Sequence, residues 1–186
     1  MRFLANALVV SVLATGCAHS KVAVTASGSG SIAKPRAADC KITFLRNLPA
    51  KEHGMAAISQ SDEEALQLFK RQIACVVEDE REAQMRLYAE DLRYEFPFAN
   101  DRPRRIEGRD AFRKAMEPIW ERRRKNRVEL SLESCEFHAT DEEGLFLAVF
   151  TLGAVIDQGE PVSSPCVQLI RVRGGRIAEV REYFEP

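Results

Sequence analysis

The sequence predicts an α+β fold in which N-terminal helices pack on a strongly curved, mainly antiparallel sheet. Two observations carry this prediction. Helical periodicity dominates the first half of segment 61–186, and four long strand-like segments follow one another to the C-terminus. Helices followed by an antiparallel meander are typical of α+β folds, with the helices covering one face of the sheet. The composition, 45% hydrophobic and 30% charged, is that of a globular domain.

Three helices are expected in order. Ser61-Asp62-Glu63-Glu64 has the spacing of a capping box, and apolar residues at helical spacing follow it. A short second helix is expected from Arg81 to Tyr88. The third begins after Gly108-Arg109-Asp110, and Pro118 should bend it. One face of this third helix carries the apolar side chains of Phe112, Ala115, Met116, Ile119 and Trp120.

Strict alternation between the second and third helices marks the first predicted strand. Leu92, Tyr94, Phe96 and Phe98 share one side of this strand, and Pro97 indicates an edge or a bulge. A loop is expected over 99–107. The remaining predicted strands, which complete the meander, cover 128–138, 145–155, 162–172 and 176–184.

The last hairpin decides which side chains meet. A three-residue loop, Arg173-Gly174-Gly175, pairs Ile170 with Ala178 and Gln168 with Val180, so that apolar residues face each other. A two-residue loop would set Ile170 beside Glu179 and break the alternation. In the first register one face contains a single ionisable group, Glu182, among Cys166, Gln168, Ile170, Val172, Ala178, Val180 and Phe184.

Glu182 is therefore the candidate catalytic residue. An unpaired carboxylate on an apolar face is costly when ionised, so we expect its pKa to lie one or two units above the ordinary value of about 4.3, which suits a general acid or base. Arg171 and Arg181 have the opposite strand parity and should point away. The alternative is that Glu182 reaches water near the C-terminus or pairs with an arginine.

The same periodicities predict a pocket for a small apolar or aromatic molecule. Glu182, Gln168, Phe96, Phe98, Met116 and Trp120 should line it, and Tyr94 and Gln168 should orient a polar group, with Gln168 able to hydrogen-bond a ligand carbonyl or the carboxylate. No cofactor is expected. No metal is expected either, because no group of His, Cys and carboxylates has metal-ligand spacing.

Three separated segments resemble the SnoaL-like and ketosteroid-isomerase-like group of the nuclear-transport-factor-two-like superfamily. They are LYAEDLRYEFPF (87–98), EGR (107–109) and GRIAEVREYFEP (175–186). The resemblance covers most of residues 61–186 and implies a cone-shaped pocket enclosed by the sheet. It does not specify a reaction, because this fold hosts isomerases, cyclases, epoxide hydrolases and non-catalytic binding domains.

Residue-by-residue comparison with these relatives limits the reactions that the resemblance implies. Phe96 stands where ketosteroid isomerase has its general-base aspartate, Phe69 or Lys70 where it has a tyrosine, and Gln168 near its second carboxyl. Steroid isomerisation by that mechanism is therefore not expected. The C-terminal segment is similar to that of phenazine-biosynthesis proteins, whose matching glutamate is an acid–base residue, which implies this role for Glu182; their histidine falls at Ala115 here.

Two hypotheses follow. The first is an enzyme that uses Glu182 for isomerisation, cyclisation or dehydration of a small apolar substrate. The second is a non-catalytic ligand-binding or dimerisation module. A homodimer formed through the sheet is expected on either hypothesis, because an apolar run as long as Leu145 to Val155 is typical of a strand covered on both faces.

The N-terminal segment has two interpretations. Residues 1–17 resemble a bacterial lipoprotein signal with Cys17 as the lipidated residue, followed by a tether over 18–60 and the domain over 61–186. This predicts a lipid-anchored protein of the cell envelope, with membrane contact only through Cys17. The alternative is a cytoplasmic protein translated from Met55, because Lys51-Glu52 can be encoded by a ribosome-binding sequence.

The cysteines and the net charge bear on disulfide formation and on nucleic-acid binding. An oxidising compartment would permit disulfides among Cys40, Cys75, Cys135 and Cys166, but the apolar surroundings of the last three favour buried thiols. A net charge of -1 gives no field that would attract nucleic acid. The basic run Arg122-Arg123-Arg124-Lys125 ends a helix, where cations complement the helix dipole.

Overall fold

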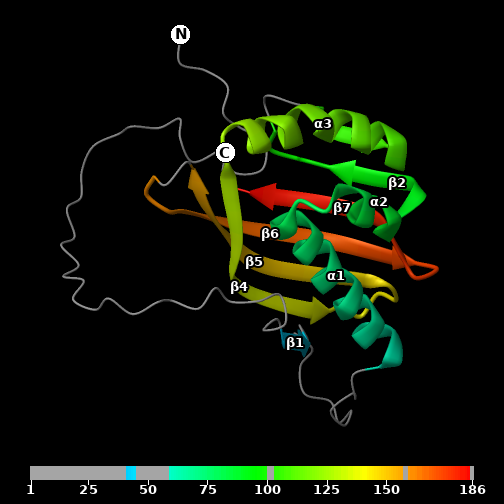
Figure 1. Ribbon diagram of the computed structural model, residues 1–186. Coiled ribbons are helices and arrows are strands. Elements are labelled where there is room, and N and C mark those ends of the chain that lie inside the picture. Colours follow the sequence, from blue (N-terminus) through cyan, green and yellow to red (C-terminus); the bar gives the residue numbers. More distant parts are fainter. Residues whose placement is uncertain (1–40, 45–58, 100–102, 157–158, 185–186) are drawn as a thin grey trace, which may run out of the picture.

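The computed structural model describes residues 41–44, 59–99, 103–156 and 159–184 (Figure 1). Its helices are α1 (Gln60–Glu78), α2 (Arg81–Leu87) and α3 (Arg109–Lys125). Its strands are β1 (Lys41–Phe44), β2 (Tyr88–Glu95), β3 (Arg105–Glu107), β4 (Val128–Ala139), β5 (Leu145–Ile156), β6 (Val162–Arg173) and β7 (Arg176–Phe184).

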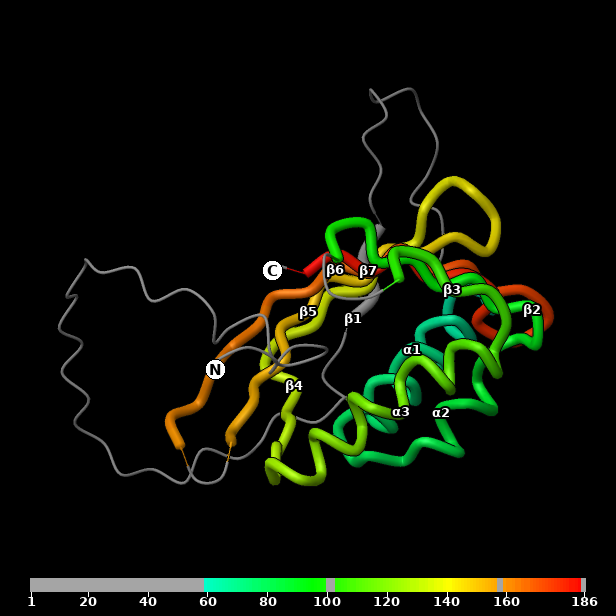
Figure 2. Tube along the Cα trace, turned by 90° about the horizontal axis from the view of Figure 1, so that it is seen from above, coloured from blue at the N-terminus to red at the C-terminus, as the bar shows by residue number. Residues whose placement is uncertain are grey.

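The described strands form a single curved sheet in the order β1-β4-β5-β6-β7-β2-β3. Consecutive strands from β4 to β7 pair antiparallel, whereas β2 runs parallel to β7 and β1 parallel to β4. Figure 2 shows the three helices gathered on one side of the sheet. The predicted α+β class is therefore confirmed, and the four C-terminal strands end within one residue of their predicted bounds.

Helix α1 begins two residues earlier than predicted. Ser59, rather than Ser61, is the N-cap, and its hydroxyl accepts a hydrogen bond from the backbone N–H of Asp62, whose carboxylate in turn accepts from the N–H of Ser59. The sequence Ser59-Gln60-Ser61-Asp62 has capping-box spacing with aspartate in the place of the more usual glutamate, which explains the displaced prediction.

Two short strands fall where the sequence predicted irregular chain. Strand β3 lies in the predicted loop and pairs antiparallel with β2. Strand β1 lies within the predicted tether 18–60 and pairs parallel with β4, where Lys41 is the partner of Glu136. Segments of three and four residues are too short for alternation to identify them.

The last hairpin differs from its predicted register. Gly174 and Gly175, with φ of 57° and 68°, form a two-residue turn, and Arg173 pairs with Arg176. The register then shifts, so Gln168 pairs with Glu182 instead of Val180. A β-bulge at Ala178 on β7 restores the alternation that the two-residue loop would otherwise break. The predicted faces are thus confirmed although the predicted pairs are wrong.

The core lies between the helices and the inner face of the sheet. Its aromatic rings stack in two groups, with Tyr94 and Phe112 centroids 4.5 Å apart and Phe69 and Phe137 centroids 5.3 Å apart. Tyr88, Phe69, Phe112 and Phe137 are almost fully buried. These rings hold α1 and α3 over the sheet and so position the polar groups between them. No helix among the described residues has the length and apolar character to cross a membrane.

Candidate functional site

An inner cavity of about 30 Å³ lies between α1, α3 and the strands β5 to β7. Most of its wall is apolar. Its polar groups come from α1, α2, β2, β6 and β7 and are Gln72, Gln84, Tyr94, Gln168 and Glu182, with Ser164 from β6. Because few polar groups converge on a largely apolar hollow, the cavity has the character of a small-molecule site.

A buried carboxylate occupies one wall of this inner cavity. Glu182 is 6% exposed, and the hydroxyl of Tyr94 donates a short hydrogen bond to its Oε2. Gln168 Nε2 also donates to Glu182 Oε2, at 2.8 Å, and lies 3.4 Å from the Tyr94 oxygen. Strand pairing explains this meeting, because Gln168 is directly opposite Glu182 and Tyr94 is paired with Val180 on the other side of β7.

Burial and the carboxyl group of Glu182 raise the pKa values of two neighbouring side chains. Burial raises the pKa of Tyr94 well above its ordinary value, and the charge of Glu182 raises it further, so Tyr94 remains a hydrogen-bond donor. Burial, with a second contribution from Glu182, raises the pKa of the Cys166 thiol to about 12. Burial disfavours the charged form of Glu182, while the two donors to its Oε2 favour that form.

The nearby arginines lie on the other face of the sheet, as the strand parity predicted. Arg181 donates to Glu95 at 2.7 Å, and Arg171 donates to Glu142 at 2.6 Å. Both pairs are on the solvent side of β6 and β7. Arg171 and Arg181 therefore do not contact the inner carboxylate, which accepts hydrogen bonds from Tyr94 and Gln168.

A second polar group at the inner cavity was missed by the sequence analysis. Gln72 and Gln84 each donate from Nε2 to the hydroxyl oxygen of Tyr88 at 3.2 Å. Gln72 is 2% exposed, although it lies on the apolar face of α1 between Phe69 and Val76. An amide on an otherwise apolar helix face was the signal that could have identified it.

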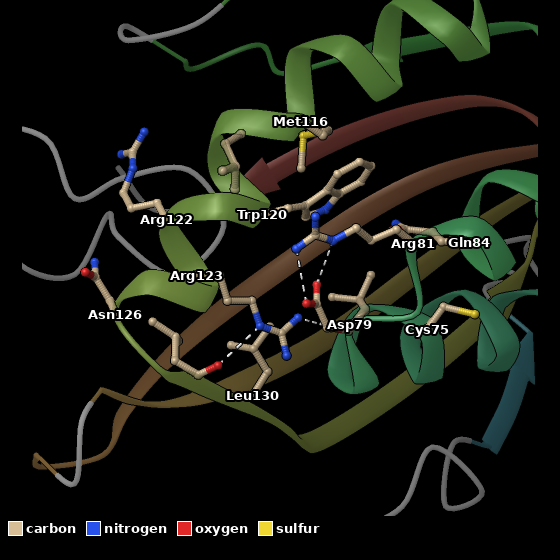
Figure 3. Close-up of a pocket in the computed structure, with 13 residues that line it drawn as sticks. Cys75, Asp79, Arg81, Gln84, Met116, Trp120, Arg122, Arg123, Asn126 and Leu130 are labelled. Atoms are coloured by element: carbon tan, nitrogen blue, oxygen red, sulfur yellow. Dashed lines mark hydrogen bonds and ion pairs between the residues drawn. The ribbon is translucent and has the colours of Figure 1, made fainter.

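An outer cavity of about 50 Å³ adjoins the inner one (Figure 3). The two share Val76, Gln84 and Met116 as lining residues. The guanidinium of Arg81 lies 5.2 Å from the ring centroid of Trp120 and donates to Asp79 at 3.2 Å. The outer cavity therefore combines an aromatic wall with a charged rim.

Arg123 gives the basic end of α3 a structural role. Its guanidinium donates to the backbone carbonyls of Val76 and Val77 at the C-terminal end of α1, and its Nε donates to the carbonyl of Val128 at 3.2 Å. The last carbonyls of a helix have no partner within that helix. One member of the run Arg122–Lys125 thus stabilises the packing of α3 against α1.

The predicted pocket residues separate into three groups. Met116 lines both cavities, and Trp120 lines the outer one. Phe96 is buried against Tyr94 and Phe184 but is not a lining residue of either cavity. Phe98 is a correction, because it is 58% exposed and packs against Tyr183. Strand β2 ends at Glu95, so the alternation that predicted an inward Phe98 does not continue through Pro97.

The cysteines also differ from the prediction in one case. Cys75 and Cys166 are buried free thiols, as expected. Cys135 is disulfide-bonded, and its partner lies outside the described residues. The partly apolar surroundings of Cys135 on β4 did not distinguish a thiol from a disulfide. Cys17 and Cys40 also lie outside the described residues. Among the described residues, no group of three or more potential ligands is placed to hold a metal ion.

Comparison with known proteins identifies the class to which this fold and cavity belong. The family model of the SnoaL-like domain matches residues 69–180, which is more than half of the chain. The chain therefore belongs to the SnoaL-like domain family. No curated protein matches it.

Solved structures support the same fold. A candidate isomerase from Bacillus subtilis is 24% identical, with a TM-score of 0.60 over 69% of this chain and 91% of that one. An NTF2-like protein from Anabaena variabilis is 20% identical, with a TM-score of 0.53 over 71% and 95%. A candidate polyketide cyclase from Xanthomonas campestris is 21% identical, with a TM-score of 0.51 over 65% and 90%. At these identities the likeness establishes the fold alone.

Proposed function

We propose that this protein binds a small, mainly apolar molecule in the inner cavity and transfers protons on it through Glu182. One observation carries the proposal: a buried carboxylate, held by Tyr94 and Gln168, forms part of the wall of an otherwise apolar cavity. A titratable group placed in this way is a candidate acid–base catalyst. The names of the isomerase and cyclase structures are compatible with this chemistry.

The reaction class is an isomerisation, cyclisation or dehydration. In each case Glu182 takes a proton from one substrate atom and returns it to another atom or to the leaving hydroxyl, so the carboxylate is regenerated. Tyr94 and Gln168 are positioning residues in this scheme, because they hold Oε2 and so fix the direction of the carboxyl group. The apolar wall limits access of water to the proton transfer.

The second candidate function is a non-catalytic ligand-binding module. Its support is the lack of a second acid–base side chain where the phenazine-biosynthesis proteins have a histidine, because Ala115 stands there. Tyr94 does not replace that histidine as a base, since its pKa is raised far above neutrality by burial and by Glu182. The cavity itself suits both functions equally.

Substitution of Glu182 separates the two functions. Once a ligand has been identified by mass spectrometry of the purified protein, Glu182→Gln should reduce its turnover by about 10²-fold or more while changing its affinity much less. The matched control is Glu179→Gln, which lies on the same strand but faces Arg93 and Arg171 on the opposite side of the sheet. If Glu182→Gln turns over the ligand at the wild-type rate, the acid–base role is wrong.

We propose a homodimer formed through the outer face of the sheet. Its support is an apolar patch in which Val149 pairs with Val167 and Leu147 pairs with Leu169 on adjacent strands. Val149 is 38% exposed at the centre of a β-sheet, where burial by a second copy would remove apolar area from water. Light scattering at micromolar concentration should give the mass of a dimer, and Val149→Glu should give a monomer.

We also propose that the chain is exported and carries a lipid on Cys17. The disulfide at Cys135 favours an oxidising compartment, and β1 pairs with the domain although it precedes Met55. A start at Met55 would remove this strand. It would also remove Cys17 and Cys40, which are the two cysteines other than Cys135 and the free thiols. Membrane fractions should therefore contain a protein whose N-terminus is a modified Cys17, and an unmodified chain beginning at Met55 would contradict the proposal.

A further inference from the structure

Two carbonyl oxygens of residues that line the inner cavity have no hydrogen-bond partner within the described part of the chain. They are Oε1 of Gln72 on α1 and Oε1 of Gln168 on β6. The two side chains are 2% and 4% exposed, so water at the protein surface does not solvate them. A buried acceptor without a donor is destabilising, and such groups in a native protein need an explanation.

The orientation of the Gln168 amide is set by its nitrogen. Gln168 Nε2 donates to Glu182 and lies near the Tyr94 oxygen, and reversing this amide would place Oε1 against the carboxylate oxygen. Gln72 Nε2 donates to the hydroxyl oxygen of Tyr88. In this arrangement neither oxygen has a hydrogen-bond partner among the described residues.

The two donors that the described part of the chain directs at the carboxylate, Tyr94 and Gln168, are already used. Tyr94 has a single O–H, which it donates to Glu182, and the amide nitrogen of Gln168 is directed at Glu182 and Tyr94. A ligand carbonyl or carboxylate at this end of the cavity would meet oxygen acceptors. A ligand hydroxyl or amine would find an acceptor in Gln168 Oε1.

We propose that the ligand is a neutral or cationic, mainly apolar molecule that presents a hydroxyl or amine donor to Gln168 Oε1 and Gln72 Oε1. This inference deepens the proposed function and rests on it, because it assigns the chemical class of the ligand in the same cavity. Of the two partners that the sequence analysis left open for Gln168, the carboxylate and a ligand carbonyl, its Nε2 bonds to the carboxylate. The proposal also disfavours carboxylate ligands, which would bring further oxygen acceptors to this end of the cavity.

The inner and outer cavities share part of their walls. Val76, Gln84 and Met116 line both the inner cavity of about 30 Å³ and the outer one of about 50 Å³. Met116 has a flexible, unbranched side chain, and its movement would join the two spaces. A six-membered ring with one polar substituent can then place its substituent at Gln168 while its ring contacts the apolar wall.

Three probes with the same ring test the donor requirement in the wild-type protein. Cyclohexanol, cyclohexanone and cyclohexanecarboxylate are titrated separately, and binding is followed by NMR at the methyl groups of Ile73, Met116 and Leu152. Cyclohexanol should bind about tenfold more tightly than cyclohexanone, because only the alcohol donates to the unpartnered oxygens. Equal or tighter binding of cyclohexanone would overturn the inference and leave the proposed site intact.

A pair of variants on α1 tests the assignment to Gln72. Gln72→Met removes the buried oxygen and should reduce the preference for cyclohexanol over cyclohexanone by about threefold or more. Gln67→Met is the matched control, because Gln67 is exposed on the same helix and bonds to Glu63. An unchanged preference in Gln72→Met contradicts the role of Gln72. If that variant does not fold, the wild-type probe series decides alone, and failure of all three probes to bind overturns the proposed function as well.

Discussion

At the scale of single residues, the site is built around one buried carboxyl group. Tyr94 and Gln168 direct hydrogen bonds to Glu182, and the thiol of Cys166 lies in the same cavity wall. The sequence identified Glu182 as the one carboxyl group on an apolar face. It did not identify the pairing of Gln168 with Glu182, because the bulge at Ala178 leaves no pattern that alternation alone would reveal.

The Cys166 thiol makes a testable contribution to alkaline stability. Its pKa is raised from 9.0 to about 12, chiefly by burial, so the folded protein retains a proton that the unfolded chain loses between these values. The free energy of unfolding should therefore fall as pH rises above 9, by at most about 1.4 kcal/mol per pH unit from this group.

Urea unfolding at about pH 8 and about pH 10.5 measures this contribution, because the two values lie on either side of the unfolded-state pKa. The variant Cys166→Ala should lose less stability between the two pH values than the wild type does, whatever its stability at the lower one. Parallel losses in the two proteins would show that the thiol does not titrate as the buried environment requires.

At the scale of elements, local chemistry accounts for most of the fold but not for its shortest parts. Helices α1 and α3 and the four strands from β4 to β7 have long periodic patterns, and their predictions are confirmed. Strands β1 and β3 have four and three residues, and pairing with a neighbour rather than pattern makes them strands. Phe98 shows the opposite error. The alternation in the sequence continues to Phe98, past the end of strand β2, so it predicted an inward side chain where the strand has already ended.

Two glycines in turns allow the cost of a left-handed backbone conformation to be separated from the cost of a steric clash. A Cβ on Gly144, at φ of 73°, would lie 2.7 Å from the carbonyl oxygen of Val172, whereas a Cβ on Gly174, at φ of 57°, would meet no atom within 4 Å. Gly174→Ala should cost about 1 to 2 kcal/mol, which is the penalty of the left-handed conformation. Gly144→Ala carries that penalty and a steric clash.

The expected order of stability is wild type, then Gly174→Ala, then Gly144→Ala. Chemical denaturation of the three proteins under one buffer condition measures it. Equal costs at the two positions would mean that the β4–β5 connection shifts to relieve the contact with Val172, so that the turn is less rigid than its geometry indicates.

At the scale of the whole molecule, the two faces of the open sheet carry different features. The inner face encloses the cavity under the helices, and the outer face carries the apolar patch around Val149. The pairing of β1 with β4 connects this domain to the segment before Met55, and Cys135 is disulfide-bonded. The sequence alone left both export and a cytoplasmic start at Met55 open. A cysteine in an apolar strand is compatible with an oxidising or a reducing compartment, so Cys135 did not distinguish them.

Thiol counting tests the state of the cysteines in the mature protein. If Cys17 is lipidated and Cys135 is paired, alkylation in denaturant should modify two thiols, Cys75 and Cys166, before reduction and two further cysteines after it. The intact mass reports both numbers. Modification of Cys135 without reduction would contradict the disulfide.

The central claim is that the inner cavity beside Glu182 holds a small molecule, and native mass spectrometry of the purified protein tests it most directly. The wild type should carry a bound organic molecule. Cys166→Phe, which fills the cavity wall, should lose it, while Val167→Phe, the next residue on β6 with the opposite orientation, should retain it. A wild-type protein without bound ligand, or the same ligand occupancy in Cys166→Phe as in Val167→Phe, would contradict the claim.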